Sequence, residues 1–94
     1  AAEMSVYFQE ELFKLRDIEA VTDIRGYGMM GGIDVKPDGA PGVRGTALQK
    51  QLFHHGLHVK FTGDAGIVAP AFIAERHHID EMMDKLKGVL SEVP

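Results

Sequence analysis

The sequence predicts an α+β fold, in which helices cover a small, mostly antiparallel sheet. Three segments carry apolar residues at helical spacing, and four short segments rich in β-branched residues lie between them in two pairs. Turns that contain glycine separate the two strands of each pair. The expected order is therefore helix, two strands, helix, two strands, helix.

Residues 2–16 are expected to form an amphipathic helix. The chain begins at Ala1, without an initiator Met and inside this helix, so we expect a truncated or processed protein. The apolar side chains of the helix recur at spacings of four, four and three: Met4, Phe8, Leu12 and Leu15.

Residues 18–25 and 29–35 predict the first pair of strands, because Val, Thr and Ile are frequent in them. The glycines of residues 26–28 allow a tight turn between the strands. Gly31 and Gly32 inside the second strand indicate a bulge, or a close approach of another backbone.

A loop is expected at residues 36–42, which read KPDGAPG. A second helix should follow over residues 43–55, with Gly56 at the position of a C-terminal cap. Its apolar stripe consists of Ala47, Leu48 and Leu52.

The second pair of strands is expected at residues 57–61 and 66–69, with a turn at residues 62–64. In the first of these strands His58 and Lys60 point away from the core, and the alternate residues that face it are Leu57, Val59 and Phe61. A last helix is expected over residues 75–91, and its apolar stripe is Ile79, Met82, Met83, Leu86, Val89 and Leu90.

Composition limits the class of protein. A chain of 94 residues predicts one domain, and a formal net charge of −4 argues against nucleic acid or an anionic membrane as a partner. The chain has no cysteine, which excludes a disulfide framework and a thiolate zinc site. It has no apolar run of about 20 residues and no signal-peptide pattern, and we expect a cytoplasmic protein.

Two apparent motifs are rejected. Residues 26–31 match the letters of the dinucleotide fingerprint, but that glycine loop must open a helix, and here it opens a strand. The five histidines are poorly placed for a metal, because Gly56 ends the helix between His54 and His58, and His77 and His78 are adjacent. We therefore predict no metal site.

Lys60 lies on a short strand beside a glycine turn, which is a suitable position for holding a small anion. A solvent-exposed strand lysine is the simpler interpretation, and the pattern alone favours it. The functional interpretation is a carboxylate anchor that offers one compact charge. Asp64 is interpreted as a turn residue, with pairing to Lys60 as the alternative.

Several segments resemble class III, pyridoxal-phosphate-dependent aminotransferases, in the branch that acts on omega-amino acids with pyruvate. Within that branch the chain is most similar to β-alanine–pyruvate aminotransferases. The resemblance extends from about Met4 to Leu90. The segments that carry it are residues 23–34 (DIRGYGMMGGID), 36–45 (KPDGAPGVRG), 56–70 (GLHVKFTGDAGIVAP) and 79–80 (ID).

The resemblance implies that residues 1–94 are the C-terminal small domain of a fold-type-I enzyme. Such an enzyme moves an amino group from an omega-amino acid to an α-keto acid such as pyruvate. In the family the large domain carries the lysine and the other groups that bind pyridoxal 5'-phosphate. No catalytic and no cofactor-binding residue is therefore expected in this chain, which should be inactive by itself.

The family's small domain contributes an arginine that binds the substrate carboxylate, and this arginine falls at Lys60. The implied role of Lys60 is substrate binding, with the charge kept and the planar fork of arginine lost. The implied partners are the large domain of the same enzyme, a second copy in a homodimer, and small amino acid and keto acid substrates.

A different class of function stays open at this point. The chain is also compatible with a freestanding α+β module that binds a small anion or mediates dimerisation. The two hypotheses differ in whether the source gene continues upstream for several hundred codons.

Overall fold

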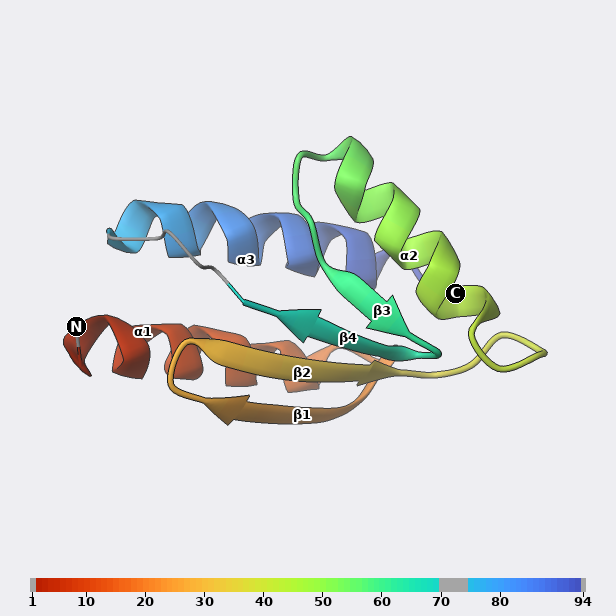
Figure 1. The fold of residues 1–94 in the computed structure, drawn as a ribbon, viewed down its shortest axis with the longest axis horizontal. Coiled ribbons are helices and arrows are strands. Elements are labelled where there is room, and N and C mark those ends of the chain that lie inside the picture. The colour runs from red at the N-terminus through yellow and green to blue at the C-terminus, as the bar shows by residue number, and fades with distance from the viewer. Residues whose placement is uncertain (1, 70–74, 94) are drawn as a thin grey trace.

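The computed structural model describes residues 2–69 and 75–93, which form one sheet with its helices on one face (Figure 1). The order of elements is the expected one. The elements are α1 (Ala2–Phe13), the 3-10 helix η1 (Lys14–Asp17), β1 (Val21–Tyr27), β2 (Met30–Val35), α2 (Val43–His54), β3 (Lys60–Thr62), β4 (Ala65–Val68) and α3 (Arg76–Ser91). Pro70, the last residue of the 56–70 segment, lies outside the described residues.

The sheet has four strands in the order β1-β2-β4-β3, and every neighbouring pair is antiparallel, as predicted. Two hairpins make up the sheet, and α2 carries the chain from the first hairpin to the outer edge of the second. A register shift between Val21 and Asp23 is a bulge in β1. It explains why the buried residues of β1, Val21 and Ile24, are three positions apart rather than two.

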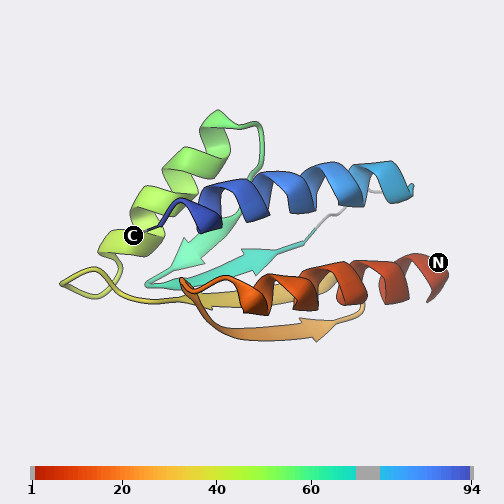
Figure 2. The same cartoon turned by 180° about the vertical axis from the view of Figure 1, so that it is seen from behind.

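The apolar core lies between the sheet and the helices, which Figure 2 shows from the helix side. All six predicted positions of the last helix are buried, and so are Phe8 and Leu12 of the first. Full burial of one such side chain contributes about 1.5–3 kcal/mol. The opposite face of the sheet, hereafter the open face, is uncovered within the described residues (Figure 1).

Each predicted strand has at least one boundary that is wrong, by one to three residues. Residues 18–20 lie in the turn after η1, where the Val21 N–H donates to the Ile18 carbonyl at 3.0 Å. The first hairpin turns at Gly28 and Met29, so residues 26 and 27 still pair with β2. Residues 57–59 approach the sheet without joining it, although Val59 is buried and Leu57 packs against the core as predicted.

Gly56 confirms its predicted role at the end of α2. It has φ = +82°, and the Leu57 N–H donates to the Leu52 carbonyl while the Gly56 N–H donates to the Phe53 carbonyl, both at 2.9 Å. These two bonds are those of a Schellman motif. The expectation for Gly31 and Gly32 is corrected, because both lie in regular register with β1 and the groups that approach them are side chains of Leu12 and Arg25.

Candidate functional site

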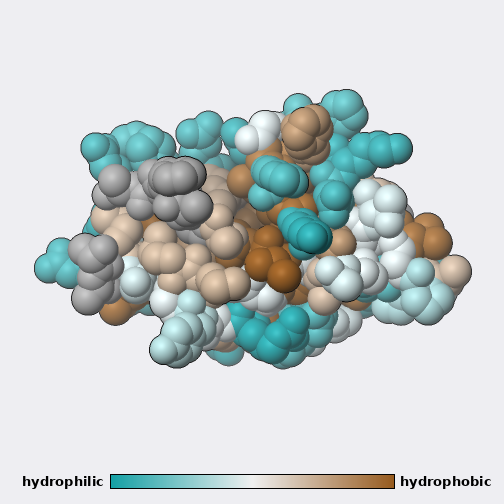
Figure 3. Space-filling view, in the orientation of Figure 1, coloured by the Kyte–Doolittle hydropathy of each residue, from teal (hydrophilic) through white to brown (hydrophobic). Residues whose placement is uncertain are grey.

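Lys60 is the first residue of β3, an edge strand, and its side chain is exposed on the open face. It lies in one row across the sheet, because Lys60 pairs with Ile67, Ile67 with Gly32, and Gly32 with Arg25. Figure 3 shows apolar side chains near the middle of this face, with hydrophilic side chains above and below them. The predicted alternation is confirmed, since His58 and Lys60 are exposed and Val59 is buried.

The ammonium of Lys60 makes no hydrogen bond or ion pair with any residue that the structure describes. Asp64, the alternative partner, is bound elsewhere. Its carboxylate accepts hydrogen bonds from the backbone N–H groups of Gly42 and Gly45, both at 3.0 Å. Asp64 is therefore a turn residue, as interpreted, and it also caps the N-terminus of α2.

The edge of β3 is held by a second contact with α2. The Phe61 N–H donates to Oε1 of Gln49 at 2.7 Å. This contact and the Asp64 cap were not predicted, because each joins residues that are 12 to 22 positions apart in the chain. A glutamine inside a helix and an aspartate after a glycine carry no local signal for such contacts.

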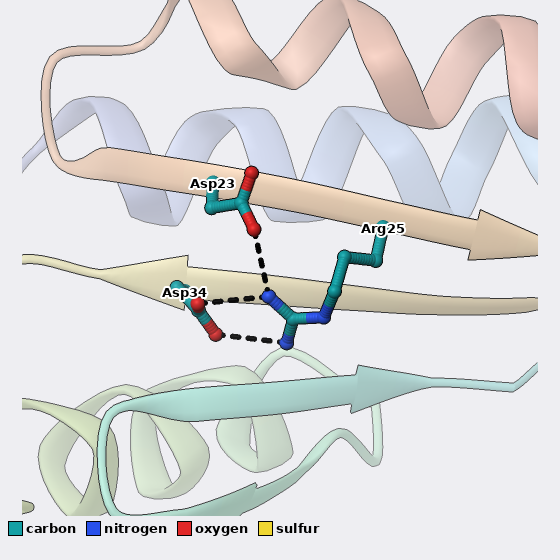
Figure 4. A network of polar contacts seen from close by, with 3 residues as sticks. All are labelled: Asp23, Arg25 and Asp34. Atoms are coloured by element: carbon teal, nitrogen blue, oxygen red, sulfur yellow. Dashed lines mark hydrogen bonds and ion pairs between the residues drawn. The ribbon is translucent and has the colours of Figure 1, made fainter.

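The other cation in the row, Arg25, is already bound to two carboxylates (Figure 4). Its guanidinium donates to Asp34 at 2.8 and 2.9 Å and to Asp23 at 2.9 Å. Hydrogen bonds from Arg25 lower the pKa of Asp34, and the two carboxylates raise the pKa of Arg25. Arg25 is thus occupied, and Lys60 is the uncommitted charge of this row within the described part of the chain.

The histidines do not form a cluster. His77 pairs with Glu75 at 3.1 Å and lies beside His78, while His58 contacts the edge of the Phe53 ring. In residues 2–69 and 75–93 no three His, Asp or Glu side chains are grouped in a way that would hold a metal ion. In the same residues no helix combines the length and the apolarity that crossing a membrane requires.

Pyridoxal phosphate requires an amine for the Schiff base, a carboxylate at the pyridine nitrogen and several donors for the phosphate. The surroundings of Lys60 do not fit this set. Its cross-strand neighbour is the apolar Ile67. The carboxylates of Asp34 in β2 and of Asp64 in the β3–β4 turn are bound to Arg25 and to backbone N–H groups at the start of α2. The described residues around Lys60 therefore do not form a cofactor site.

Comparisons with known proteins place the chain in a family. The family model for class III aminotransferases matches residues 1–90. An omega-aminotransferase of Caulobacter vibrioides is 35% identical over 94 residues, which cover 99% of this chain and 21% of that protein. A beta-alanine–pyruvate aminotransferase of Pseudomonas aeruginosa is 32% identical over 94 residues, with the same coverage of 99% and 21%. The chain thus spans about a fifth of the length of the curated relatives that it matches.

The fold agrees with this result. A solved transaminase with L-Ala superposes with a TM-score of 0.90 at 24% identity, over 98% of this chain and 23% of the other. An omega transaminase of Pseudomonas jessenii in complex with PMP gives a TM-score of 0.87 at 22% identity, over 98% and 22%. Because the family model matches residues 1–90, the chain belongs to the class III aminotransferases.

Proposed function

We propose that this chain is the C-terminal small domain of an aminotransferase, and that Lys60 binds the carboxylate of its substrates. The observation that carries the proposal is the exposed ammonium of Lys60, which has no partner among the described residues. It lies on a strand that α2 contacts directly through Phe61 and indirectly through Asp64 of the following turn. An exposed cation on a fixed backbone is a suitable anchor for a carboxylate. The amino donor is an omega-amino acid and the acceptor an α-keto acid such as pyruvate, by similarity to the named relatives.

Pyridoxal phosphate, held by the rest of the whole protein, supplies the electron sink for the reaction. The part of this chain is to bind and orient the substrate. A lysine offers a point charge without the bidentate geometry of arginine, so it discriminates less sharply between carboxylates that differ in position. A broad range of accepted omega-amino acids is the expected consequence.

Substitution of Lys60 in the full-length protein tests the role of its charge. We expect Lys60→Met to raise KM for a carboxylated amino donor and for pyruvate about 10- to 100-fold, since hydrogen bonds to charged groups contribute about 1.5–3 kcal/mol. Lys60→Arg is the matched control, because it keeps the charge. KM for a donor amine without a carboxylate, measured in the half-reaction of that donor alone, should be unchanged. Unchanged KM for both carboxylated substrates in Lys60→Met contradicts the proposal.

The open face is proposed to pack against the large domain of the same enzyme. Tyr27 is 88% exposed there and Met30 55%, and both border a shallow depression of about 300 Å³. Apolar surface of this kind favours association.

By itself the chain should therefore form dimers, and sedimentation that gives a monomer mass at every concentration contradicts this expectation. It should also catalyse nothing, because the cofactor is held by the rest of the whole protein. An open reading frame that continues upstream of Ala1 supports the domain assignment, and a start codon directly before it opposes it.

A further inference from the structure

The outer edge of β3 has a partner from outside the sheet. Lys60 and Thr62 pair with Ile67 and Ala65 of β4, and Phe61 lies between them. Backbone groups alternate in direction along a strand, so the N–H of Phe61 points away from β4. Oε1 of Gln49 accepts a hydrogen bond from it at 2.7 Å. The residue directly after Lys60 is therefore fixed to a helix.

The position of Gln49 is itself fixed by the packing of α2. Gly45 lies one helical turn before Gln49, on the same face of the helix. A Cβ added at Gly45 would lie 1.9 Å from the carbonyl oxygen of Gly63, so the helix rests directly on the backbone of the β3–β4 turn. This close approach brings the amide of Gln49 within reach of the strand.

The ring of Phe61 fixes the direction in which its neighbours point. A Cβ added at Gly66 would lie 2.7 Å from the ring, and one added at Gly45 would lie 3.2 Å from it. The ring thus fills the space between β4 and α2 on the helix side of the sheet. Since successive side chains of a strand point to opposite faces, Lys60 is directed to the open face.

We propose that Gln49 is a positioning residue for Lys60, an inference that rests on the proposed function of Lys60. Gln49 acts through the Phe61 N–H, and it keeps a strand of three residues from fraying at its free edge. A lysine side chain has many rotamers, so the location of its ammonium depends on how well its backbone is held. Without the hydrogen bond from the Phe61 N–H to Gln49, the ammonium of Lys60 samples more positions and binds a carboxylate less well.

The test compares Gln49→Met with Gln49→Glu in the full-length protein. Methionine keeps the length of the side chain and removes the acceptor, whereas glutamate keeps an acceptor oxygen. We expect Gln49→Met to raise KM for a carboxylated donor about 3- to 10-fold with kcat within about twofold, as the loss of one hydrogen bond predicts. Gln49→Glu should keep KM for the same donor close to that of the parent protein. Gln49→Ala replaces Gln49→Met if that variant does not fold.

Gln9→Met is the matched control for a purely structural effect. Nε2 of Gln9 donates to the carbonyls of Gly28 and Met30 at 2.7 and 3.2 Å, so it holds the other hairpin, which lacks Lys60. We expect no change in KM from this variant. Hydrogen–deuterium exchange should become faster at residues 60–62 in Gln49→Met and stay unchanged there in Gln9→Met.

The double variant separates failure of the inference from failure of the proposed function. In a Lys60→Met background, Gln49→Met should raise KM no further, because Gln49 affects KM only through the position of the Lys60 ammonium. If Lys60→Met raises KM and Gln49→Met does not, the positioning role is wrong while the anchor stands. If the two effects multiply, Gln49 acts independently of Lys60 and the inference is overturned. An unchanged KM in Lys60→Met alone overturns the anchor, and the positioning role falls with it.

Discussion

The two hairpins of the sheet are held in similar ways and differ in how their cations are used. A glutamine from the neighbouring helix binds the backbone of each, Gln9 of α1 in the β1–β2 hairpin and Gln49 of α2 in the β3–β4 hairpin. In the first hairpin Arg25 is neutralised by Asp23 and Asp34. In the second, Lys60 has no partner among the described residues.

This difference shows that a cation on a strand is a candidate ligand anchor only when its own strand and the neighbouring strands do not already supply its counter-ion. Arg25 has the better geometry for a carboxylate, because its planar fork binds two oxygens at once. That fork is filled by Asp34. Lys60 has the poorer geometry, but its charge has no partner in residues 2–69 and 75–93, so the lack of a counter-ion rather than the residue type identifies the candidate site.

The largest effect should come from breaking the contact between α2 and the second hairpin. Gly45→Ala places a methyl group where the carbonyl oxygen of Gly63 lies, at 1.9 Å, and backbone on both sides must move. We expect the free energy of unfolding to fall by about 3 kcal/mol in urea titrations. Gly88→Ala is the control, because that helical glycine has open space around it and alanine there should stabilise by up to about 1 kcal/mol. Equal changes in the two variants would show that α2 does not rest on the turn.

A smaller effect should follow removal of the Asp64 cap. Asp64→Ala leaves the N–H groups of Gly42 and Gly45 without their acceptor, and the free energy of unfolding should fall by about 1–2 kcal/mol. Asp64→Asn keeps one acceptor oxygen and should lose less. Asp84→Ala, at an exposed position of α3, should change stability by less than about 0.5 kcal/mol. A loss no larger than that of Asp84→Ala would mean that the cap contributes nothing.

The smallest effect concerns the charges of the first hairpin and depends on pH. Arg25 lowers the pKa of Asp34 below its ordinary value of 3.8 in the folded chain. The unfolded chain therefore takes up the proton first, and the stability that the pair contributes is present above pH 3.8 and is lost as pH falls through the folded pKa. Because both side chains are partly exposed, salt should weaken the effect. Arg25→Gln should flatten the pH dependence of the urea midpoint in this acid range, and a dependence as steep as in the parent chain would exclude the pair as its cause.

The element order and the core were predictable because their signals are local. Phe8 and Leu12, or Ile79 and Leu86, recur at helical spacing whatever surrounds them, and all four are buried. Strand ends were less predictable, since residues 57–59 alternate like a strand while the Schellman motif at Gly56 holds their start away from the ladder. The spacing of apolar residues shows which side of a segment faces the core, but it does not show where the backbone begins to pair with the next strand.

The contacts around Lys60 were not predictable, for a different reason. Asp64, Gln49 and Gly45 come from two elements, and each gains its role only when α2 lies on the second hairpin. The same holds for Arg25, whose two carboxylates come from two strands. Lys60 itself could be singled out from its place on a short strand beside a glycine turn, and the resemblance supplied the role of carboxylate anchor, which remains a prediction.

The contact between Gln49 and Phe61 also affects how the sheet meets other molecules. An edge strand offers unpaired N–H and carbonyl groups on which a foreign strand can add, and this is a common route to aggregation. At β3 the outward N–H is already taken by the glutamine side chain, and at the opposite edge β1 carries a bulge and the charged Asp23 and Arg25. These features disfavour the addition of a foreign strand at either edge, and with it growth into a larger, intermolecular sheet.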